Sequence, residues 1–216
     1  MPNNQNSYVS ENNEQQIWFP FNQEEVLEET QLEVEPASRT LLADLQAGGL
    51  ILYSRHAEAN VGVDQQFINF QDCATQRNLG ETGRTQAITF GETLRQLQIP
   101  IMYPVSVSPF CRTYETGALA FGANGVQVDP FWADIYRLSG PLDPMEQARI
   151  LYQLQTVLET PPTPGSNKVI IAHSFPSGVG LDTLPNMGTI VVRPRGQGNG
   201  YEVVAYLTLN DLTNLG

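Results

Sequence analysis

Histidine and cysteine are scarce in this chain, which has two of each among its 216 residues. Two cysteines are too few for a disulfide scaffold or a cysteine-rich zinc site, and two histidines largely exclude a histidine-rich metal centre. Sites built from carboxylates stay open. Long apolar runs are also absent, since none approaches the length of about 18 residues that indicates a transmembrane helix. We therefore expect no membrane span.

Basic residues are few as well. Eleven Lys and Arg stand against 23 Asp and Glu, which gives a formal net charge of -12. A protein that coats nucleic acid needs a basic face, so we expect no nucleic-acid partner. The charge is uneven, because residues 1–40 contain eight glutamates and one arginine. The rest of the chain has fifteen acidic and ten basic residues, so a pocket within it can still be locally basic.

The N-terminal region differs in composition from the rest. Residues 1–16 are rich in Asn, Gln, Ser and Glu, which is typical of disorder. They lack the basic and then apolar pattern of a signal peptide, which favours the cytoplasm, whereas a leader outside this sequence would permit export. Residues 17–36 mix aromatic side chains with glutamates. We interpret residues 1–38 as an acidic arm, which either docks its aromatics on the body or stays loose, and residues 39–216 as one domain.

Helical and strand-like segments alternate through the body of the chain. Apolar periodicity predicts helices over residues 39–47, 81–97, 113–121 and 144–158. Short apolar runs predict strands over residues 50–54, 104–108, 125–128 and 168–172, and then over 189–193 and 202–207 around a glycine-rich hairpin turn. This alternation is typical of an α/β fold, and we expect a three-layer α/β/α sandwich with a mainly parallel sheet.

Both histidines follow predicted strands. Arg55 and His56 come directly after the first strand, and His173 comes directly after the fourth. Arg112 follows the second strand, in the segment Ser108 to Thr116. Ligands of open parallel α/β sheets bind at the carboxyl ends of the strands. We therefore expect these four side chains at one edge of the sheet.

Two arginines and two imidazoles at one edge indicate a site for a phosphoryl group. The guanidinium fork binds phosphate oxygens through two parallel hydrogen bonds. One imidazole can attack phosphorus and form a phosphohistidine, and a second can stabilise the charge on the group in transfer. Each residue alone has an ordinary explanation as a turn residue or a solvated charge. Four of them together, including every histidine of the chain, favour the phosphate site.

These residues also carry a resemblance to a known family. Arg55-His56-Ala57-Glu58 resembles the Arg-His-Gly motif of the histidine phosphatase (phosphoglycerate mutase-like) superfamily. Further segments resemble its other motifs in the same order, and these are Leu79 to Ala87, Ser108 to Thr116 and Ala172-His173-Ser174. The resemblance extends over residues 40–207. The stretch Asp72 to Leu79 is similar to a bacterial branch of small histidine phosphatases with poorly defined substrates.

The resemblance implies a role for each matched position. His56 would be the nucleophile that is transiently phosphorylated. Arg55, Arg112 and His173 would hold the phosphoryl oxygens. The alanines at positions 57 and 172 stand where the family has glycine, and we expect the small added methyl group at position 57 to be tolerated.

The resemblance also implies a carboxylate that protonates the leaving oxygen and later activates water. The segment Asp129 to Asp134 resembles the family's Pro-x-Leu-x-Glu pattern, which makes Asp134 the expected acid. Glu58, two residues after the nucleophile, is the alternative. Arg77 either widens the anion pocket or is a surface charge.

The function implied is that of a phosphomonoesterase for a small phosphorylated metabolite or a phosphopeptide, working through a phosphohistidine on His56. This mechanism requires no metal or other cofactor. A non-catalytic phosphate-binding module on the same fold is the first alternative. A phosphoglycerate mutase is the second, and residues 39–216 leave little room for the extra segments that enclose its substrate. The oligomeric state stays open.

Cys73 and Cys111 flank the expected site. Whether they form a disulfide stays open: the bond can form in an exported protein, whereas in the cytosol they would be reduced thiols. Neither has a partner base in the sequence, and a Cys-x5-Arg loop is absent, so the pattern excludes a cysteine-based phosphatase.

Overall fold

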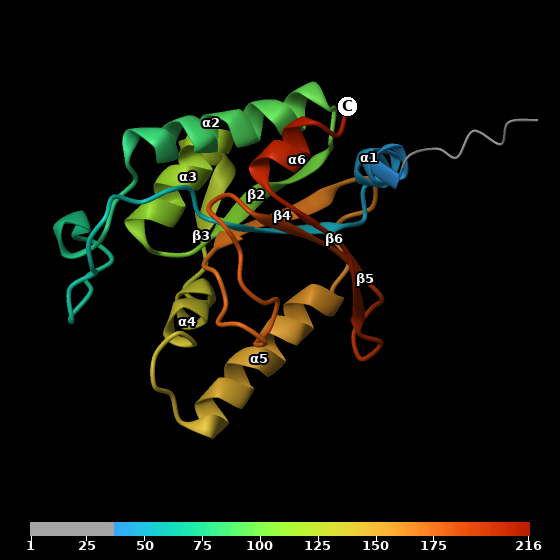
Figure 1. Ribbon diagram of the computed structural model, residues 1–216. Coiled ribbons are helices and arrows are strands. Elements are labelled where there is room, and N and C mark those ends of the chain that lie inside the picture. The colour runs from blue at the N-terminus through green and yellow to red at the C-terminus, as the bar shows by residue number, and fades with distance from the viewer. Residues whose placement is uncertain (1–36) are drawn as a thin grey trace, which may run out of the picture. The chain divides into compact units, whose positions relative to one another are not determined.

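The computed structural model describes residues 37–216, which form a six-stranded sheet with helices on both faces (Figure 1). The elements in chain order are α1 (Ala37–Ala47), β1 (Ile51–Arg55), η1 (Cys73–Thr75), α2 (Glu81–Gln96), β2 (Ile101–Val107), α3 (Cys111–Phe121), η2 (Ala123–Gly125), β3 (Val126–Val128), α4 (Phe131–Arg137), α5 (Pro144–Glu159), β4 (Asn167–Ala172), β5 (Thr189–Pro194), β6 (Tyr201–Leu207) and α6 (Leu209–Thr213). The arm expected over residues 1–38 lies outside the described residues, apart from its last two, which begin α1.

The strand order across the sheet is β3-β2-β4-β1-β5-β6. The pairs β2–β3, β2–β4 and β1–β4 are parallel. The pairs β1–β5 and β5–β6 are antiparallel. The expected three-layer sandwich with a mainly parallel sheet is confirmed.

Each face of the sheet buries its own apolar layer, because successive residues of a strand point to opposite sides. Leu52 of β1 and Ile171 of β4 pack with apolar residues of α1, α2, α3 and α6. Their neighbours Tyr53 and Ile170 pack on the other face with α4 and α5. In Figure 1 these two groups of helices lie on opposite sides of the sheet. Both faces of β1 and β4 are buried, which explains their continuous apolar runs.

The predicted helices and strands are all present, and most of their bounds lie within two or three residues of the prediction. Two short helices were not predicted, α4 and α6, which have seven and five residues. Helices of this length contain too few turns to show an apolar period. The glycine-rich segment after β5 connects it to the antiparallel strand β6, which confirms the expected hairpin.

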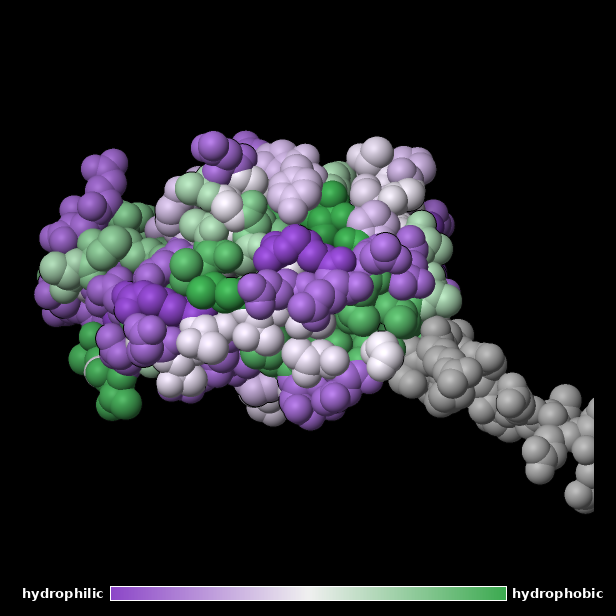
Figure 2. Space-filling view, turned by 90° about the horizontal axis from the view of Figure 1, so that it is seen from above, coloured by the Kyte–Doolittle hydropathy of each residue, from purple (hydrophilic) through white to green (hydrophobic). Residues whose placement is uncertain are grey.

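Figure 2 views the molecule from the side of α2 and α6, where hydrophilic and hydrophobic residues are interspersed. The described helices contain none that is both long enough and apolar enough to cross a bilayer.

Helix α2 begins in contact with the backbone that follows β1. The backbone N–H of Gly80 donates to the carbonyl oxygen of Glu58 at 3.1 Å. A Cβ atom placed on Gly83 would lie only 2.0 Å from the same oxygen. Glycine at position 83 therefore permits the close approach that holds α2 against the segment just after His56.

We predict that Gly83→Ala lowers the free energy of unfolding by about 2 kcal/mol, because the added methyl group must push α2 away from Glu58. Helix propensity alone predicts the opposite sign, a gain of about 1 kcal/mol. The change corresponds to a fall in Tm of about 4 to 8 °C, measurable by thermal denaturation. Gly140→Ala is the matched control, since its nearest neighbour, Arg137 O, is 3.5 Å from the new atom. A higher Tm for Gly83→Ala would contradict this packing.

Candidate active site

A cavity of about 300 Å³ opens at the carboxyl ends of β1, β2 and β4. Its lining is rich in cations and imidazoles, and consists of Arg55, His56, Gly62, Val63, Asp64, Arg77, Arg112, Tyr136, Ser139, His173 and Ser174. The four residues that the sequence analysis expected at one sheet edge therefore line one cavity. Arg77 lines it too.

The parallel pairing of β1 with β4 brings the two histidines together. Arg55 lies opposite Ala172 in the register, and the backbone N–H of His56 donates to the carbonyl oxygen of Ala172 at 3.0 Å. The two imidazole rings are consequently edge to face, with centroids 5.5 Å apart. Each ring is almost fully buried.

Hydrogen bonds fix the tautomer of His56. Its Nδ1 lies 2.7 Å from the carbonyl oxygen of Ala57, which can only accept, so Nδ1 carries the proton. The Nε2 atom accepts from Arg112 Nε at 3.2 Å. His56 therefore presents an unprotonated nitrogen with a lone pair beside a guanidinium group.

The environment keeps His56 neutral. Burial and then the charge of Arg112 lower its pKa from 6.5 to about 3, and Arg55 and Arg77 act in the same direction. The imidazole is therefore neutral at physiological pH. Burial and the neighbouring His56 and arginines likewise hold the pKa of His173 well below its usual value.

Two hydrogen bonds hold His173, one to its ring and one to its backbone. Its Nε2 lies 2.9 Å from the hydroxyl oxygen of Ser108, and its carbonyl oxygen accepts from the Tyr53 hydroxyl at 2.7 Å. Among the described residues, its buried Nδ1 has no hydrogen-bond partner. A buried polar atom of this kind is costly unless something satisfies it.

Three guanidinium groups crowd the cavity. Arg55 Nη1 donates to the carbonyl oxygen of Leu184 at 2.7 Å, and Arg77 Nε donates to that of Asn60 at 3.2 Å. Burial and then the charges of Arg77 and Arg112 lower the pKa of Arg55. Like charges therefore lie close together in the cavity lining, which makes the cavity locally cationic.

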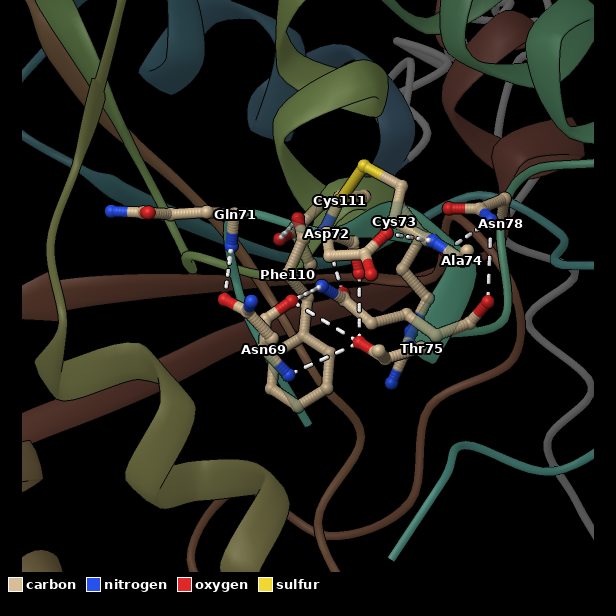
Figure 3. The surroundings of a disulfide bond; sticks show 12 residues. Asn69, Gln71, Asp72, Cys73, Ala74, Thr75, Asn78, Phe110 and Cys111 are labelled. Atoms are coloured by element: carbon tan, nitrogen blue, oxygen red, sulfur yellow. Dashed lines mark hydrogen bonds between the residues drawn. A yellow bond between two sulfur atoms is a disulfide. The ribbon is translucent and has the colours of Figure 1, made fainter. Parts of the chain in front are cut away.

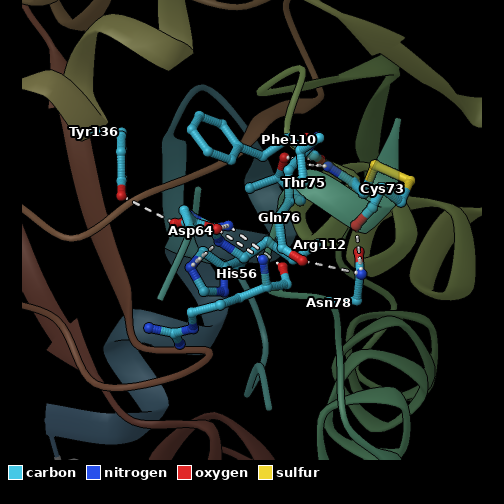
Figure 4. Close-up of polar contacts among 12 residues, drawn as sticks. His56, Asp64, Cys73, Thr75, Gln76, Asn78, Phe110, Arg112 and Tyr136 are labelled. Carbon is cyan, nitrogen blue, oxygen red and sulfur yellow. Dashed lines mark hydrogen bonds and ion pairs between the residues drawn. A yellow bond between two sulfur atoms is a disulfide. The ribbon is translucent and has the colours of Figure 1, made fainter. Parts of the chain in front are cut away.

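Asp64 is a cavity residue that the sequence analysis missed. Its side chain is 5% exposed, and its carboxylate accepts from Arg112 Nη1 at 2.9 Å and Nη2 at 3.2 Å. The backbone N–H of Arg77 and the hydroxyl of Tyr136 also donate to it, at 2.8 and 3.0 Å (Figure 4). Asp64 lies 48 residues from Arg112 in an irregular segment, and no motif or period marks it in the sequence. Tyr136 was missed with its short helix, α4.

The structure does not bring either expected acid to the cavity. The Asp134 carboxylate on α4 accepts from Arg137 Nη1 at 2.9 Å and from Arg149 Nη2 at 2.7 Å, and Asp134 is absent from the lining. Two arginines thus hold it outside the cavity. Glu58 is exposed and is also absent from the lining.

A disulfide joins Cys73 of η1 to Cys111, the first residue of α3 (Figure 3). It ties the irregular segment that carries Asp64 and Arg77 to the helix that carries Arg112. The side chain of Gln76 adds to this link by accepting from the backbone N–H of Cys111 at 2.9 Å.

Comparisons with known proteins give structural neighbours only. No family model and no curated protein matches the sequence. A mycobacterial glucosyl-3-phosphoglycerate phosphatase in complex with VO3 is 19% identical, with 72% of this chain and 97% of that one covered and a TM-score of 0.48. A phosphoserine phosphatase from Entamoeba histolytica, in complex with 3-phosphoglyceric acid, is 16% identical, with coverages of 76% and 98% and a TM-score of 0.48.

The protein histidine phosphatase SixA in complex with tungstate is also similar, at 16% identity, coverages of 76% and 99% and a TM-score of 0.48. The neighbours are histidine phosphatase superfamily members. At these identities the likeness concerns the course of the chain alone.

We predict that neither histidine ring titrates between about pH 5 and pH 8, because the lowered pKa values keep both rings neutral. With two histidines in the chain, NMR of the ring signals against pH tests both at once. A midpoint near the ordinary value of about 6.5 for His56 would contradict its burial beside Arg112.

We also predict that replacing Cys73 and Cys111 by serine lowers the free energy of unfolding by about 4 kcal/mol. Removing the link frees a loop of 38 residues in the unfolded chain. Denaturant titration with and without a thiol reductant measures the effect, and the double serine variant, which should not respond to the reductant, is the control. An unchanged midpoint for the reduced wild-type protein would count against a stabilising bond.

Proposed function

We propose that this protein is a phosphomonoesterase that works through a covalent phosphohistidine on His56. The observation that carries the proposal is the state of His56, whose Nδ1 proton is held by the carbonyl oxygen of Ala57 and whose Nε2 lone pair lies beside Arg112 in a cationic cavity. A neutral imidazole with a fixed tautomer is the form that attacks phosphorus.

The charge of the cavity suits one phosphoryl group. Arg55, Arg77 and Arg112 contribute three positive charges and Asp64 one negative charge, so with both histidines neutral the net charge is two positive. A phosphate monoester carries up to two negative charges. Its oxygens would be bound by the guanidinium groups and by Nδ1 of His173, if Ser108 donates its hydroxyl proton to Nε2.

In the first step, the Nε2 lone pair forms a bond to phosphorus and the bond between phosphorus and the ester oxygen breaks. The leaving oxygen takes the electron pair. The imidazole becomes positively charged, and the Ala57 carbonyl stabilises it through the Nδ1 proton. The Nε–H of Arg112, no longer bound to Nε2, donates to a phosphoryl oxygen. Water then attacks phosphorus, and the bond between phosphorus and Nε2 breaks with its electron pair returning to Nε2. The phosphate leaves with the two protons of the water, and His56 is again neutral.

The leaving oxygen of an alkyl phosphate needs a proton, for which Asp134 and Glu58 were the expected donors. Since neither lines the cavity, a substrate with a good leaving group is the appropriate test. An aryl phosphate meets this condition. The physiological substrate class that we propose is a small phosphomonoester or a phosphopeptide side chain, in keeping with a cavity of about 300 Å³.

The absence of both expected acids from the cavity lining favours a second candidate, a phosphate-binding module without turnover. It uses the same cavity, cations and fold, and it needs no proton donor because no leaving group departs. The disulfide favours an oxidising compartment as the place of either function, because such bonds are rare in the cytosol.

We predict that the protein hydrolyses p-nitrophenyl phosphate and that His56→Asn lowers turnover by about 1000-fold or more, because the nucleophile is lost. Labelled substrate should leave an acid-labile, alkali-stable phosphate on the wild-type chain alone. Binding of inorganic phosphate by calorimetry is the control, since His56→Asn keeps the three arginines.

Equal turnover by the two proteins would rule out the phosphohistidine route. Phosphate binding by the wild-type protein without hydrolysis of any phosphomonoester would establish the binding module instead. Interconversion of 2- and 3-phosphoglycerate would identify a mutase.

A further inference from the structure

We propose that Asp64 is a positioning residue of this site, whose carboxylate orients the guanidinium group of Arg112 so that one edge of it faces His56 Nε2. This inference deepens the proposed function and rests on it. Two sets of observations carry it: the use of every acceptor position on Asp64, and the pattern of donors on Arg112.

The hydrogen-bonding capacity of Asp64 is fully used inside the protein. Its Oδ1 accepts from the Arg77 backbone N–H and from Arg112 Nη1, and its Oδ2 accepts from Arg112 Nη2 and from the Tyr136 hydroxyl. An ionised carboxylate offers about four lone-pair positions. Asp64 therefore has none left for a substrate, although it lines the cavity.

Arg112 uses one edge for Asp64 and directs another at His56. Both Nη atoms donate to the Asp64 carboxylate, and Nη1 also faces the carbonyl oxygen of Arg77 at 3.4 Å. The Nε–H donates to His56 Nε2. One N–H of Nη2 has no partner among the described residues, and it lies on the same edge as Nε–H. A phosphoryl group on Nε2 would meet two parallel donors on this edge.

The remaining contacts of Arg112 do not fix this orientation. Its guanidinium lies 4.4 Å from the ring centroid of Phe110 and 5.5 Å from that of Tyr136. Ring contacts of this kind attract the cation without specifying where each N–H points. The two-pronged carboxylate pair does specify it, because it sets the plane and the in-plane rotation of the guanidinium.

The charge state of Asp64 argues against a role as the missing acid. Burial opposes its ionisation, but the Arg77 backbone N–H, the charge of Arg112 and the Tyr136 hydroxyl outweigh burial and lower its pKa. Asp64 is thus charged in the resting protein and has no proton to give. Its full set of hydrogen bonds leads to the same conclusion from geometry alone.

The test is Asp64→Asn, which keeps the shape of the side chain but turns one prong of the fork into a donor that faces an Arg112 donor. We expect kcat on p-nitrophenyl phosphate to fall on the order of 100-fold, because the guanidinium edge is misplaced. The Kd of inorganic phosphate should stay the same or decrease, since the cavity changes from two net positive charges to three. The activity of the variant on alkyl phosphates and on aryl phosphates should fall by the same factor.

Asp72→Asn is the matched control in the same segment. The Asp72 carboxylate accepts from the backbone N–H of Ala74 and does not contact Arg112. The kcat and the phosphate affinity of this variant should therefore equal those of the wild-type protein. If Asp64→Asn does not fold, Tyr136→Phe, which removes only the hydroxyl bond to Asp64, should lower kcat by about 3-fold to 10-fold at unchanged phosphate affinity.

Three outcomes would overturn the inference. The first is unchanged kcat for Asp64→Asn in an active enzyme. The second is loss of phosphate affinity in proportion to kcat, which would make Asp64 a general support of the fold. The third is a larger loss on alkyl than on aryl phosphates, which would make Asp64 the proton donor.

A readout without turnover separates this inference from the proposed function. The ¹⁵N chemical shift of His56 Nε2 depends on the bond from Arg112 Nε. It should move in Asp64→Asn and stay in place in Asp72→Asn. That result supports the positioning role even if the wild-type protein hydrolyses nothing, and an unmoved signal in both variants refutes it even if the enzyme is active.

Discussion

The parallel pairing of β1 with β4 is the constraint on which the site depends. These are the two central strands, each directly followed by a histidine, and their register places Arg55 opposite Ala172. The ladder continues one residue further, through the bond from the His56 backbone N–H to the Ala172 carbonyl. A slip of one residue would turn one imidazole to the other face of the sheet. Leu52 and Tyr53 are buried on opposite faces, and a slip would exchange side chains of different size between two close-packed layers, which opposes it.

Burial on this edge of the sheet creates the electrostatics of the site. The desolvation that lowers the pKa of His56 also penalises the cations beside it. A single carboxylate, Asp64, offsets this cost at Arg112, whose pKa it raises against the effect of burial. The cavity keeps an excess of positive charge although the chain as a whole has a net charge of -12. Local placement of the arginines, rather than composition, determines which ligand the cavity attracts.

The parts of the site that could be predicted are those attached to regular elements. His56, His173 and Arg112 follow apolar strands, and the rule that parallel strands present ligands at their carboxyl ends brings them together. The fold class and the hairpin after β5 could also be predicted, because they depend on the apolar periodicity of regular elements. The position of Asp134 could not be predicted in this way. Its place in a motif does not reveal that two arginines bind its carboxylate outside the cavity.

The irregular segment between β1 and α2 supplies what periodicity cannot predict. It carries Asp64 and Arg77, and long-range links hold it in place: the disulfide to Cys111 and the bond from the Cys111 N–H to Gln76. Both links attach it to the first turn of α3, one residue before Arg112. The segment that carries the carboxylate is thus joined to the turn that precedes the guanidinium by links that do not involve the sheet. An irregular segment that is cross-linked in this way can hold a carboxylate against Arg112, and thereby Arg112 beside His56, without being part of the sheet.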